Sequence, residues 1–338
     1  SCSLVGSEMC IRDRITCLVT IADDIPEFEN YIPNGIGNVG AFTVADTVEP
    51  IVEYADKLQK YLVNHTRLGI PALIHCEASA GAQFTEADVF PSAIAQASTF
   101  DTEVVGEMTD IIRKQMYYVG FRQALSPVVD ITRDPRWGRT YETYGEDQYL
   151  ISQMGIHYVR GMQNQGVSCI AKHFLGYAET QAGLNTATTR LNDRELYEVF
   201  ATPFEAADKE AGLDAMMANY AEIDGLPVID NKKIARDLLR DTMGFEGMLT
   251  SDGAAVLKTY NYFKVANSYM EAGLLAKKAK EFESVCTIEK GGKSVNITKL
   301  MALMGLGVKQ GDTVTVTCEG ADEDKASEAL KAFFEETL

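Results

Sequence analysis

The chain has 338 residues, of which 46% are hydrophobic and 24% are charged. This balance is typical of a globular protein that can bury a sizeable core. The formal net charge of −18 argues against binding to nucleic acid, because phosphates require a basic surface. No apolar run approaches the roughly 18 residues that cross a bilayer. We therefore expect no nucleic-acid and no membrane partner, whereas a neutral small molecule is compatible with the charge.

The cysteines are odd in number and widely scattered, and none of them forms a CxxC pair. Their spacing predicts neither a zinc site nor a disulfide framework. We therefore predict no metal and no cofactor, and a reducing, cytoplasmic location fits best. The seven residues are Cys2, Cys10, Cys17, Cys76, Cys169, Cys286 and Cys318.

The first fourteen residues, SCSLVGSEMCIRDR, differ in character from the rest. They lack the long apolar centre of a signal peptide. The stretch Ser3–Asp13 reads like the in-frame translation of an adapter used in preparing DNA libraries. We expect residues 1–14 to be non-native and the fold to begin at residue 15.

Short apolar runs then alternate with amphipathic helices. Residues Gly35–Gly40 can form a strand and a loop. A helix is predicted to start at Asp46-Thr47, with Pro50 in its first turn. A short buried strand follows at Ala72–Ile74. The apolar face of the helix that starts at Asp46-Thr47 is expected to contain Ile51, Val52, Ala55, Leu58 and Leu62.

The same alternation continues through the middle of the chain. Asp101 can cap a helix, and Asn192 followed by Glu195 forms a capping-box pattern. The helix after Asp101 has an apolar stripe at Val104, Val105, Met108, Ile111 and Ile112. Strand-like runs lie at Ser126–Val129, Ser168–Ala171, Ala215–Ala218 and Gly247–Thr250. Such spacing predicts parallel βα units, in a TIM-type barrel or a doubly wound sheet. No GxGxxG follows the first strand, which disfavours a dinucleotide-binding fold.

Polar residues stand at the end of each strand-like run. In a parallel barrel these ends converge on one face, where substrates bind. Surface charges without a shared role would be scattered instead. The polar ends are His75-Cys76-Glu77, Asp130, Lys172-His173, Asn219-Tyr220 and Ser251-Asp252.

Several segments together resemble glycoside hydrolase family 3, over about residues 33–279. They are RLGIPALIHCEASAG, SPVVDITRDPRWGRTYETYGED, CIAKHFLGY, MMANYAEIDGLPV and GFEGMLTSDGAAV. RDPRWGR and TSDG are specific in combination, whereas KHF alone would be weak. The resemblance implies an α/β fold, an incomplete (β/α)8 TIM-type barrel over residues 15–279. It also implies a β-glucosidase-like, retaining hydrolase.

The resemblance assigns the catalytic residue and three of the sugar-binding residues. Asp252, after the run Met248–Thr250, is placed as the nucleophile; the alternative is an aspartate that caps the next helix. Glu77 is expected to accept two sugar hydroxyls, or else to be a salt-bridged loop residue. Lys172 and His173 are expected to donate to neighbouring hydroxyls, although His173 by itself would more often be a structural histidine.

Further binding residues are implied by the same motifs. Arg139 is expected to be a third donor, with Arg133 and Arg136 forming internal ion pairs. Tyr220 and Met217 match wall positions of the sugar pocket, and plain core packing is a close alternative for Met217.

Some positions depart from the family pattern. Many relatives have Trp where this chain has Gly253, and some have Arg where it has Gln83 or Leu184. Tyr177 follows Gly176, so the KHFxGH variant of the N-acetylglucosaminidase branch is absent. These features favour a β-glucosidase or β-xylosidase and leave the sugar open.

Residues 280–338 resemble the last two-thirds of HPr, the small α+β open-faced sandwich of the sugar phosphotransferase system. Strands are expected at Val285–Ile288 and Thr313–Cys318, and helices at Ile297–Leu306 and Glu323–Glu336. The register of the phosphorylated loop, Ser268–Ala272, has no histidine. Phosphoryl transfer is therefore not expected.

Three functions remain open. The first is hydrolysis of terminal β-D-glycosidic bonds through an aspartyl glycosyl-enzyme, with a small-molecule β-glycoside as partner. The family usually adds a second domain that supplies the acid/base residue, and this domain is expected to be absent from the chain. The alternatives are a non-catalytic sugar-binding fragment and a chimeric product with an inactive phosphocarrier tail.

Overall fold

The computed structural model describes residues 16–21, 28–43, 47–267, 285–290, 293–296, 315–319, 324 and 327–328. The chain divides into two units. The first contains Ser1–Asn219 and Phe245–Thr250, and the second contains Tyr220–Gly244 and Ser251–Leu338. Both predicted domain boundaries, at residues 14/15 and 279/280, lie outside the described residues.

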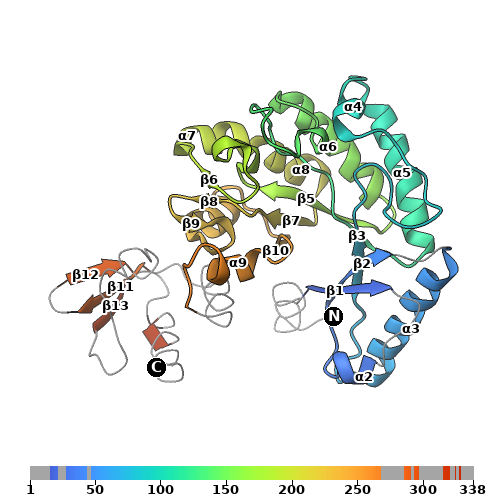
Figure 1. Ribbon diagram of the computed structural model, residues 1–338, viewed down its shortest axis with the longest axis horizontal. Coiled ribbons are helices and arrows are strands. Elements are labelled where there is room, and N and C mark those ends of the chain that lie inside the picture. Colours follow the sequence, from blue (N-terminus) through green and yellow to red (C-terminus); the bar gives the residue numbers. More distant parts are fainter. Residues whose placement is uncertain are drawn as a thin grey trace. The chain divides into compact units, whose positions relative to one another are not determined.

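A seven-stranded sheet runs through the first unit, in the order β1-β2-β3-β4-β5-β7-β10. Neighbouring strands from β1 to β7 pair in parallel, with helices in the connections (Figure 1). Parallel strands that follow one another across helices are the βα units of a barrel. The predicted incomplete barrel is therefore confirmed. The strands are β1 (Thr16–Ile21), β2 (Asn38–Thr43), β3 (Leu73–Cys76), β4 (Gln123–Ala124), β5 (Ser168–Phe174), β7 (Ala215–Ala218) and β10 (Met248–Ser251).

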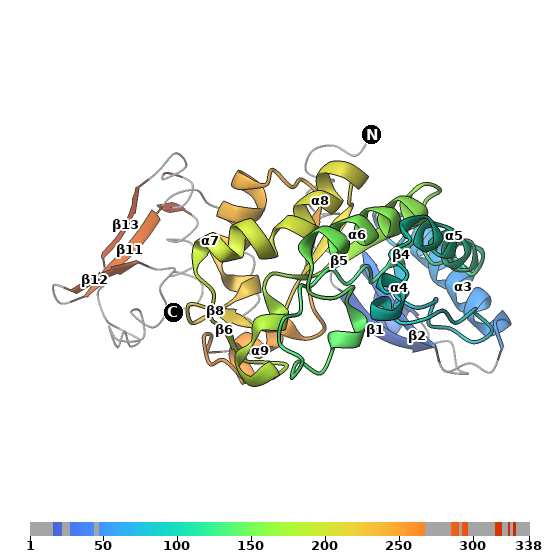
Figure 2. The same cartoon turned by 90° about the horizontal axis from the view of Figure 1, so that it is seen from above.

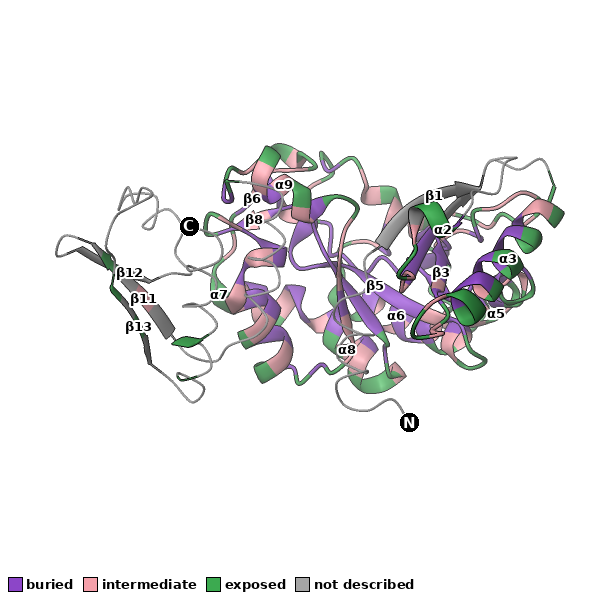
Figure 3. Cartoon of the chain, turned by 90° about the horizontal axis from the view of Figure 1, so that it is seen from below, coloured by how far each residue is buried: buried purple, intermediate pink, exposed green. Residues whose placement is uncertain are grey.

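Helices cover one face of this sheet, and α5, α6 and α8 lie side by side along it (Figures 1 and 2). Buried residues follow β5 and the sides of α6 and α8 that face it (Figure 3). The helices are α2 (Phe28–Tyr31), α3 (Glu49–His65), α4 (Ala93–Ala97), α5 (Thr102–Tyr118), α6 (Gln148–Gln163), α7 (Asp193–Glu195), the π-helical turn η4 (Leu196–Phe200) and α8 (Thr202–Ala211). Shorter elements of this unit are η1 (Thr140–Glu142), η2 (Tyr177–Glu179), η3 (Gln181–Gly183) and β6 (Thr188–Thr189).

Both predicted helix caps are confirmed. The Asp101 carboxylate accepts from the backbone N–H groups of Glu103 and Val104 at 3.1 and 3.2 Å. The Asn192 side chain accepts from the backbone N–H of Glu195 at 2.9 Å. Each cap satisfies amides that have no partner inside the helix.

The predicted apolar faces of α3 and α5 were too wide. Val105, Met108 and Ile112 are buried on α5, whereas Val104 is 50% exposed. On α3, Val52 is likewise 41% exposed. Neighbouring residues on a helix point about 100° apart, so adjacent apolar residues cannot all face the sheet. Helix α3 also begins at Glu49, later than predicted, with Pro50 in its first turn.

The strand predicted at Ser126–Val129 was misplaced. The paired strand here is β4, which comprises only Gln123 and Ala124. Pro127 has no N–H and cannot donate to a ladder. Its carbonyl still accepts from the backbone N–H of Lys172 at 3.0 Å, and Val128 forms an isolated bridge to Lys172.

The second unit contains a hairpin of β8 (Glu222–Ile223) and β9 (Leu226–Pro227). Asp224 and Gly225 join them with φ of 55° and 82°, as tight hairpin turns require. Next come η5 (Val228–Asp230), the π-helical segment η6 (Lys233–Thr242) and α9 (Ala255–Asn261).

The same unit holds an antiparallel sheet in the order β12-β11-β13. Its strands are β11 (Val285–Lys290), β12 (Lys293–Asn296) and β13 (Thr315–Glu319). The strands predicted at Val285–Ile288 and Thr313–Cys318 are therefore confirmed, with shifted ends. The helix predicted at Ile297–Leu306 lies outside the described residues, as does most of Glu323–Glu336. Within the part of the chain that the structure describes, no helix is long and apolar enough to span a bilayer.

Candidate active site

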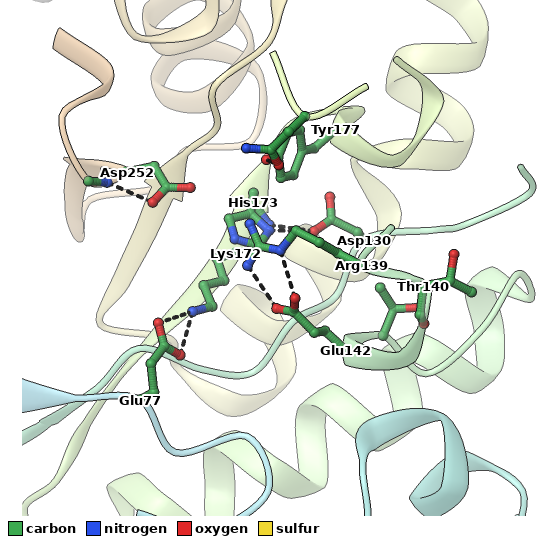
Figure 4. A network of polar contacts seen from close by, with 12 residues as sticks. Glu77, Asp130, Arg139, Thr140, Glu142, Lys172, His173, Tyr177 and Asp252 are labelled. Carbon is green, nitrogen blue, oxygen red and sulfur yellow. Dashed lines mark hydrogen bonds and ion pairs between the residues drawn. The ribbon is translucent and has the colours of Figure 1, made fainter. Parts of the chain in front are cut away.

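Glu77 and Lys172 form an ion pair in the first unit. Glu77 directly follows β3, and Lys172 lies on β5, with β4 between these strands. The Lys172 Nζ donates to both carboxylate oxygens of Glu77, at 2.7 and 2.6 Å (Figure 4). The Lys172 side chain is only 2% exposed, whereas that of Glu77 is 28% exposed. The pair therefore holds a lysine under a carboxylate that solvent or a ligand can still reach.

His173 is held by Asp130, the polar residue at another predicted strand end. The Asp130 Oδ2 accepts from the backbone N–H of His173 at 2.9 Å and lies 2.7 Å from its Nδ1. Burial lowers the pKa of His173 well below its usual value, and the positive charges of Arg139 and Lys172 lower it further. A neutral ring that donates from Nδ1 leaves Nε2 as an acceptor. His173 is thus fixed in orientation by its neighbour.

Arg139 is held by Glu142, three residues further along the turn η1. Two bonds join them, from Nε to Oε1 at 2.8 Å and from the terminal guanidinium nitrogen to Oε2 at 2.7 Å (Figure 4). Burial opposes the charge, but this bidentate bond raises the pKa of Arg139 above its usual value. The fork geometry fixes the guanidinium plane.

Tyr177 connects the arginine and the histidine. Its ring centroid is 5.6 Å from the guanidinium carbon of Arg139 and 4.9 Å from the ring of His173, edge to face. The buried ring of Trp137 also packs against it, with the two ring centroids 5.3 Å apart. Tyr177 itself is fully buried, so these contacts make one rigid aromatic support.

The other arginines of RDPRWGR form ion pairs, as predicted. Arg133 bonds to Glu179 at 3.1 Å and to Glu195 at 2.8 Å, but its side chain is 39% exposed, so this pair is not internal. Arg136 bonds to Asp134 at 2.6 Å, but its side chain is 68% exposed, so this second pair is not internal.

Met217 packs in a hydrophobic cluster with Leu125, Ile170 and Ala215, and Met248 lies against it. It is 6% exposed, as expected if Met217 simply packs in the core. Its role as a wall of the sugar pocket stays a prediction.

A buried polar chain runs across the strands beside Lys172. The Nδ1 of His75 contacts the Oδ1 of Asn38, and the Asn38 amide donates to Gln123 at 2.8 Å. Burial lowers the pKa of His75 to about 4, and Lys172 contributes. His75 is therefore neutral near pH 7.

Tyr220 and Asp252 lie in the second unit. Asp252 comes directly after β10, and its Oδ1 accepts from the backbone N–H of Gly253 at 2.6 Å. The residue at the N-cap of α9 is Ala254, which has no side-chain capping bond. The alternative of Asp252 as the cap of the next helix is therefore not realised.

Tyr220 contacts two residues of the segment that follows Asp252. A Cβ on Gly253 would lie 3.3 Å from the Tyr220 hydroxyl. The Lys258 Nζ lies 3.7 Å from the centre of the Tyr220 ring. Burial lowers the pKa of Lys258, while Asp252 acts in the opposite direction.

Sequence reasoning named Asp130 only as a polar strand end, and it gave no role to Glu142, Tyr177 or Lys258, which also hold or support the predicted residues. Asp130 stood at a strand end, and Glu142 stood three residues after Arg139, so both gave a signal. The roles of Tyr177 and Lys258 depend on packing and gave none. Among the described residues, no group of three or more His, Cys, Asp or Glu side chains could hold a metal ion.

Two family models match the sequence. The model of the glycosyl hydrolase family 3 N terminal domain matches residues 20–279. The model of the PTS HPr component phosphorylation site matches residues 270–336. Both resemblances predicted from the sequence are confirmed, and the two matches overlap at residues 270–279.

Curated relatives and solved structures agree with the first match. A β-xylosidase of Formosa agariphila is 36% identical over 227 residues, covering 63% of this chain and 31% of its own length. A periplasmic β-glucosidase of Salmonella typhimurium is 30% identical over 226 residues, covering 65% of this chain and 28% of its own length.

A β-glucosidase structure from Erythrobacter marinus superposes with a TM-score of 0.75 at 32% identity, covering 81% of this chain and 38% of that one. A β-glucosidase from Listeria innocua in complex with glucose gives a TM-score of 0.65 at 31% identity, covering 72% and 33%. The chain spans about a third of the length of the first curated relatives that it matches. With the family model matched over residues 20–279, this chain belongs to the glycosyl hydrolase family 3 N-terminal domain family.

Proposed function

We propose that the protein hydrolyses terminal β-D-glycosidic bonds with retention, and that Asp252 is the nucleophile. The observation that carries the proposal is the family match over residues 20–279, in which Asp252 directly follows a strand of the barrel sheet. The relatives are a β-xylosidase and β-glucosidases, so we propose a terminal β-glucosyl or β-xylosyl unit as substrate.

The proposed reaction has two steps. The ionised Asp252 forms a bond to the anomeric carbon as the bond from that carbon to the leaving oxygen breaks. The leaving oxygen takes a proton from an acid, for which we assign no group among the described residues. Water then attacks the same carbon, loses a proton and releases the sugar from Asp252 with the original configuration.

The side chains of the first unit are proposed to bind the sugar hydroxyls. Glu77 is proposed to accept two hydroxyl groups through its exposed edge while Lys172 holds it. Lys172 is proposed to donate to a neighbouring hydroxyl as well, since an ammonium group has three donors. Arg139 is proposed to donate from the guanidinium that Glu142 orients. His173, with its Nδ1 on Asp130, is proposed to accept a hydrogen bond from a hydroxyl through Nε2, where the sequence had predicted that it donates one. Tyr220 and Met217 are proposed as pocket walls.

A slow-turnover substrate tests the nucleophile directly. The full chain would be incubated with 2,4-dinitrophenyl 2-deoxy-2-fluoro-β-D-glucoside, whose leaving group needs little acid assistance. We expect one fluoroglycosyl group per chain, located on Asp252 by peptide mass spectrometry. The xyloside analogue, run in parallel, separates the two sugars.

Matched variants make the result decisive. Asp252→Asn should take up no label. Asp224→Asn, which removes the same charge from the exposed β8–β9 turn, should be labelled like the parent chain. No labelling of Asp252 in the parent, together with measurable sugar binding, would instead support a non-catalytic sugar-binding protein.

A cytoplasmic location stays a prediction, which fractionation of producing cells would check.

A further inference from the structure

We infer that Lys258 is a positioning residue that holds the Tyr220 ring beside the segment that follows the nucleophile. This inference rests on the proposed function of Asp252. It concerns a lysine six residues further along the chain, on the last turn of α9, which the sequence did not single out. All of its geometry lies within the second unit.

The contact of Lys258 with Tyr220 is short and face-on. Its Nζ lies 3.7 Å from the ring centroid, well inside the roughly 6 Å range of a cation–π interaction. The Lys258 side chain is partly buried, and this burial lowers the pKa of its ammonium group. Partial removal of water strengthens the attraction of a cation to a ring face, so the contact can hold the ring.

Gly253 limits the opposite movement, at the edge of the ring. A Cβ at residue 253 would lie 3.3 Å from the Tyr220 hydroxyl, so the hydroxyl already fills the space beside that backbone. Asp252 is the preceding residue, and its Oδ1 is bonded to the backbone N–H of Gly253 at 2.6 Å. Lys258 on the face and Gly253 at the edge therefore fix where Tyr220 stands relative to the nucleophile segment.

Lys258 has a local electrostatic environment as well. Asp252 favours its charged form, and the attraction between two opposite charges is reciprocal. Other residues on α9 and just after it make different contacts. Thr259 donates to Asp230 at 2.5 Å, and Lys264 lies 5.6 Å from the ring of Tyr260.

The test uses the rate of Asp252 labelling by the dinitrophenyl fluoroglucoside at saturation, measured on the full chain. Lys258→Met removes the cation and keeps the stem, and we expect labelling about tenfold slower with little change in the saturating concentration. Lys258→Arg keeps a cation for the ring face and should recover to within about threefold of the parent. The matched control is Lys264→Met, which should label at the parent rate.

A double-mutant cycle separates positioning from a general loss of structure. In a Tyr220→Leu background there is no ring to hold, so adding Lys258→Met should slow labelling by less than about twofold. Equal losses from Lys258→Met in both backgrounds would overturn the inference, as would a failure of Lys258→Arg to recover.

A measurement without chemistry distinguishes this inference from the proposed function. The Tyr220 ring signals in ¹³C NMR can be assigned by their disappearance in Tyr220→Phe. We expect them to shift in Lys258→Met and to return toward the parent value in Lys258→Arg. Unchanged signals would overturn the inference even if Asp252 is labelled. A shift without any labelling of Asp252 would refute the nucleophile and leave Lys258 as the residue that holds Tyr220.

Discussion

Removal of the Glu77 carboxylate should destabilise the barrel much more than removal of its lysine partner. Lys172 is 2% exposed and donates to both oxygens of Glu77. Glu77→Ala therefore leaves a buried ammonium without its counter-charge. Breaking such a pair costs about 3–5 kcal/mol when both groups are buried. Because the Glu77 side chain is 28% exposed, water screens part of the interaction, and we expect about 3 kcal/mol.

The opposite deletion leaves the more accessible partner behind. In Lys172→Met the remaining carboxylate can be hydrated, so the cost should be only about 1–2 kcal/mol. The surface pair of Lys57 and Glu53 provides a control, since its side chains are 50% and 60% exposed. Glu53→Ala should cost less than about 0.5 kcal/mol.

Urea unfolding followed by tryptophan fluorescence measures these differences. Trp137 is the single tryptophan, is 1% exposed and lies in the same unit as the pair. Its emission therefore reports on the unfolding of this part of the chain. If Glu77→Ala cost no more than Lys172→Met, or no more than Glu53→Ala, the reasoning from burial would be wrong.

Three further results should follow from the same unit. Gly161→Ala should destabilise the first unit by about 2–3 kcal/mol, because the new methyl would meet the Thr109 hydroxyl and come within 2.9 Å of the Gly106 carbonyl oxygen. The control in the same urea titration is Gly138→Ala, whose new methyl would have no atom within 4 Å. Asp101→Ala should cost about 1 kcal/mol by removing the cap of α5, seen as a lower urea midpoint. Burial lowers the pKa of His75 to about 4 in the folded chain. Between about pH 6.5 and 4, the unfolded chain therefore binds a proton at His75 that the folded chain does not bind. The free energy of unfolding should fall by up to about 3 kcal/mol as the pH falls through that window. His173 also has a lowered pKa and contributes in the same direction, so His75→Gln should reduce this dependence without abolishing it. An unchanged slope in the variant would contradict the assignment.

The fold could be predicted from the sequence because its signals are local and repeated. Each strand run, such as Ala215–Ala218, is short, apolar and bounded by helices, and the caps at Asp101 and Asn192 have the residues that capping requires. The misplaced strand at residues 126–129 arose from Pro127, whose missing N–H prevents a regular ladder. The width of the α5 stripe was misjudged because composition alone does not show which of two adjacent residues, Val104 or Val105, faces the sheet.

The candidate site was predictable only in part. Strand ends indicated Glu77, Lys172 and Asp130, since parallel strands present their last residues at one edge of a sheet. The sequence could not show that Asp130 holds His173, because partners so far apart in the chain meet only after the sheet has formed. Tyr177 likewise resembles any buried tyrosine until its two ring contacts are seen.

The pairing of charges in the first unit is itself an argument about the ligand. Lys172 is matched by Glu77, and Arg139 by Glu142, while Asp130 holds a neutral His173. A site for an anion commonly leaves cations whose charge the ligand then balances. A neutral sugar cannot balance a charge, so the side chains that bind its hydroxyls must bring their own counter-charges. Two matched pairs are what a neutral polyol requires, and a glucuronide, which adds a negative charge to a ligand proposed to contact Glu77, should be a poorer ligand than the glucoside.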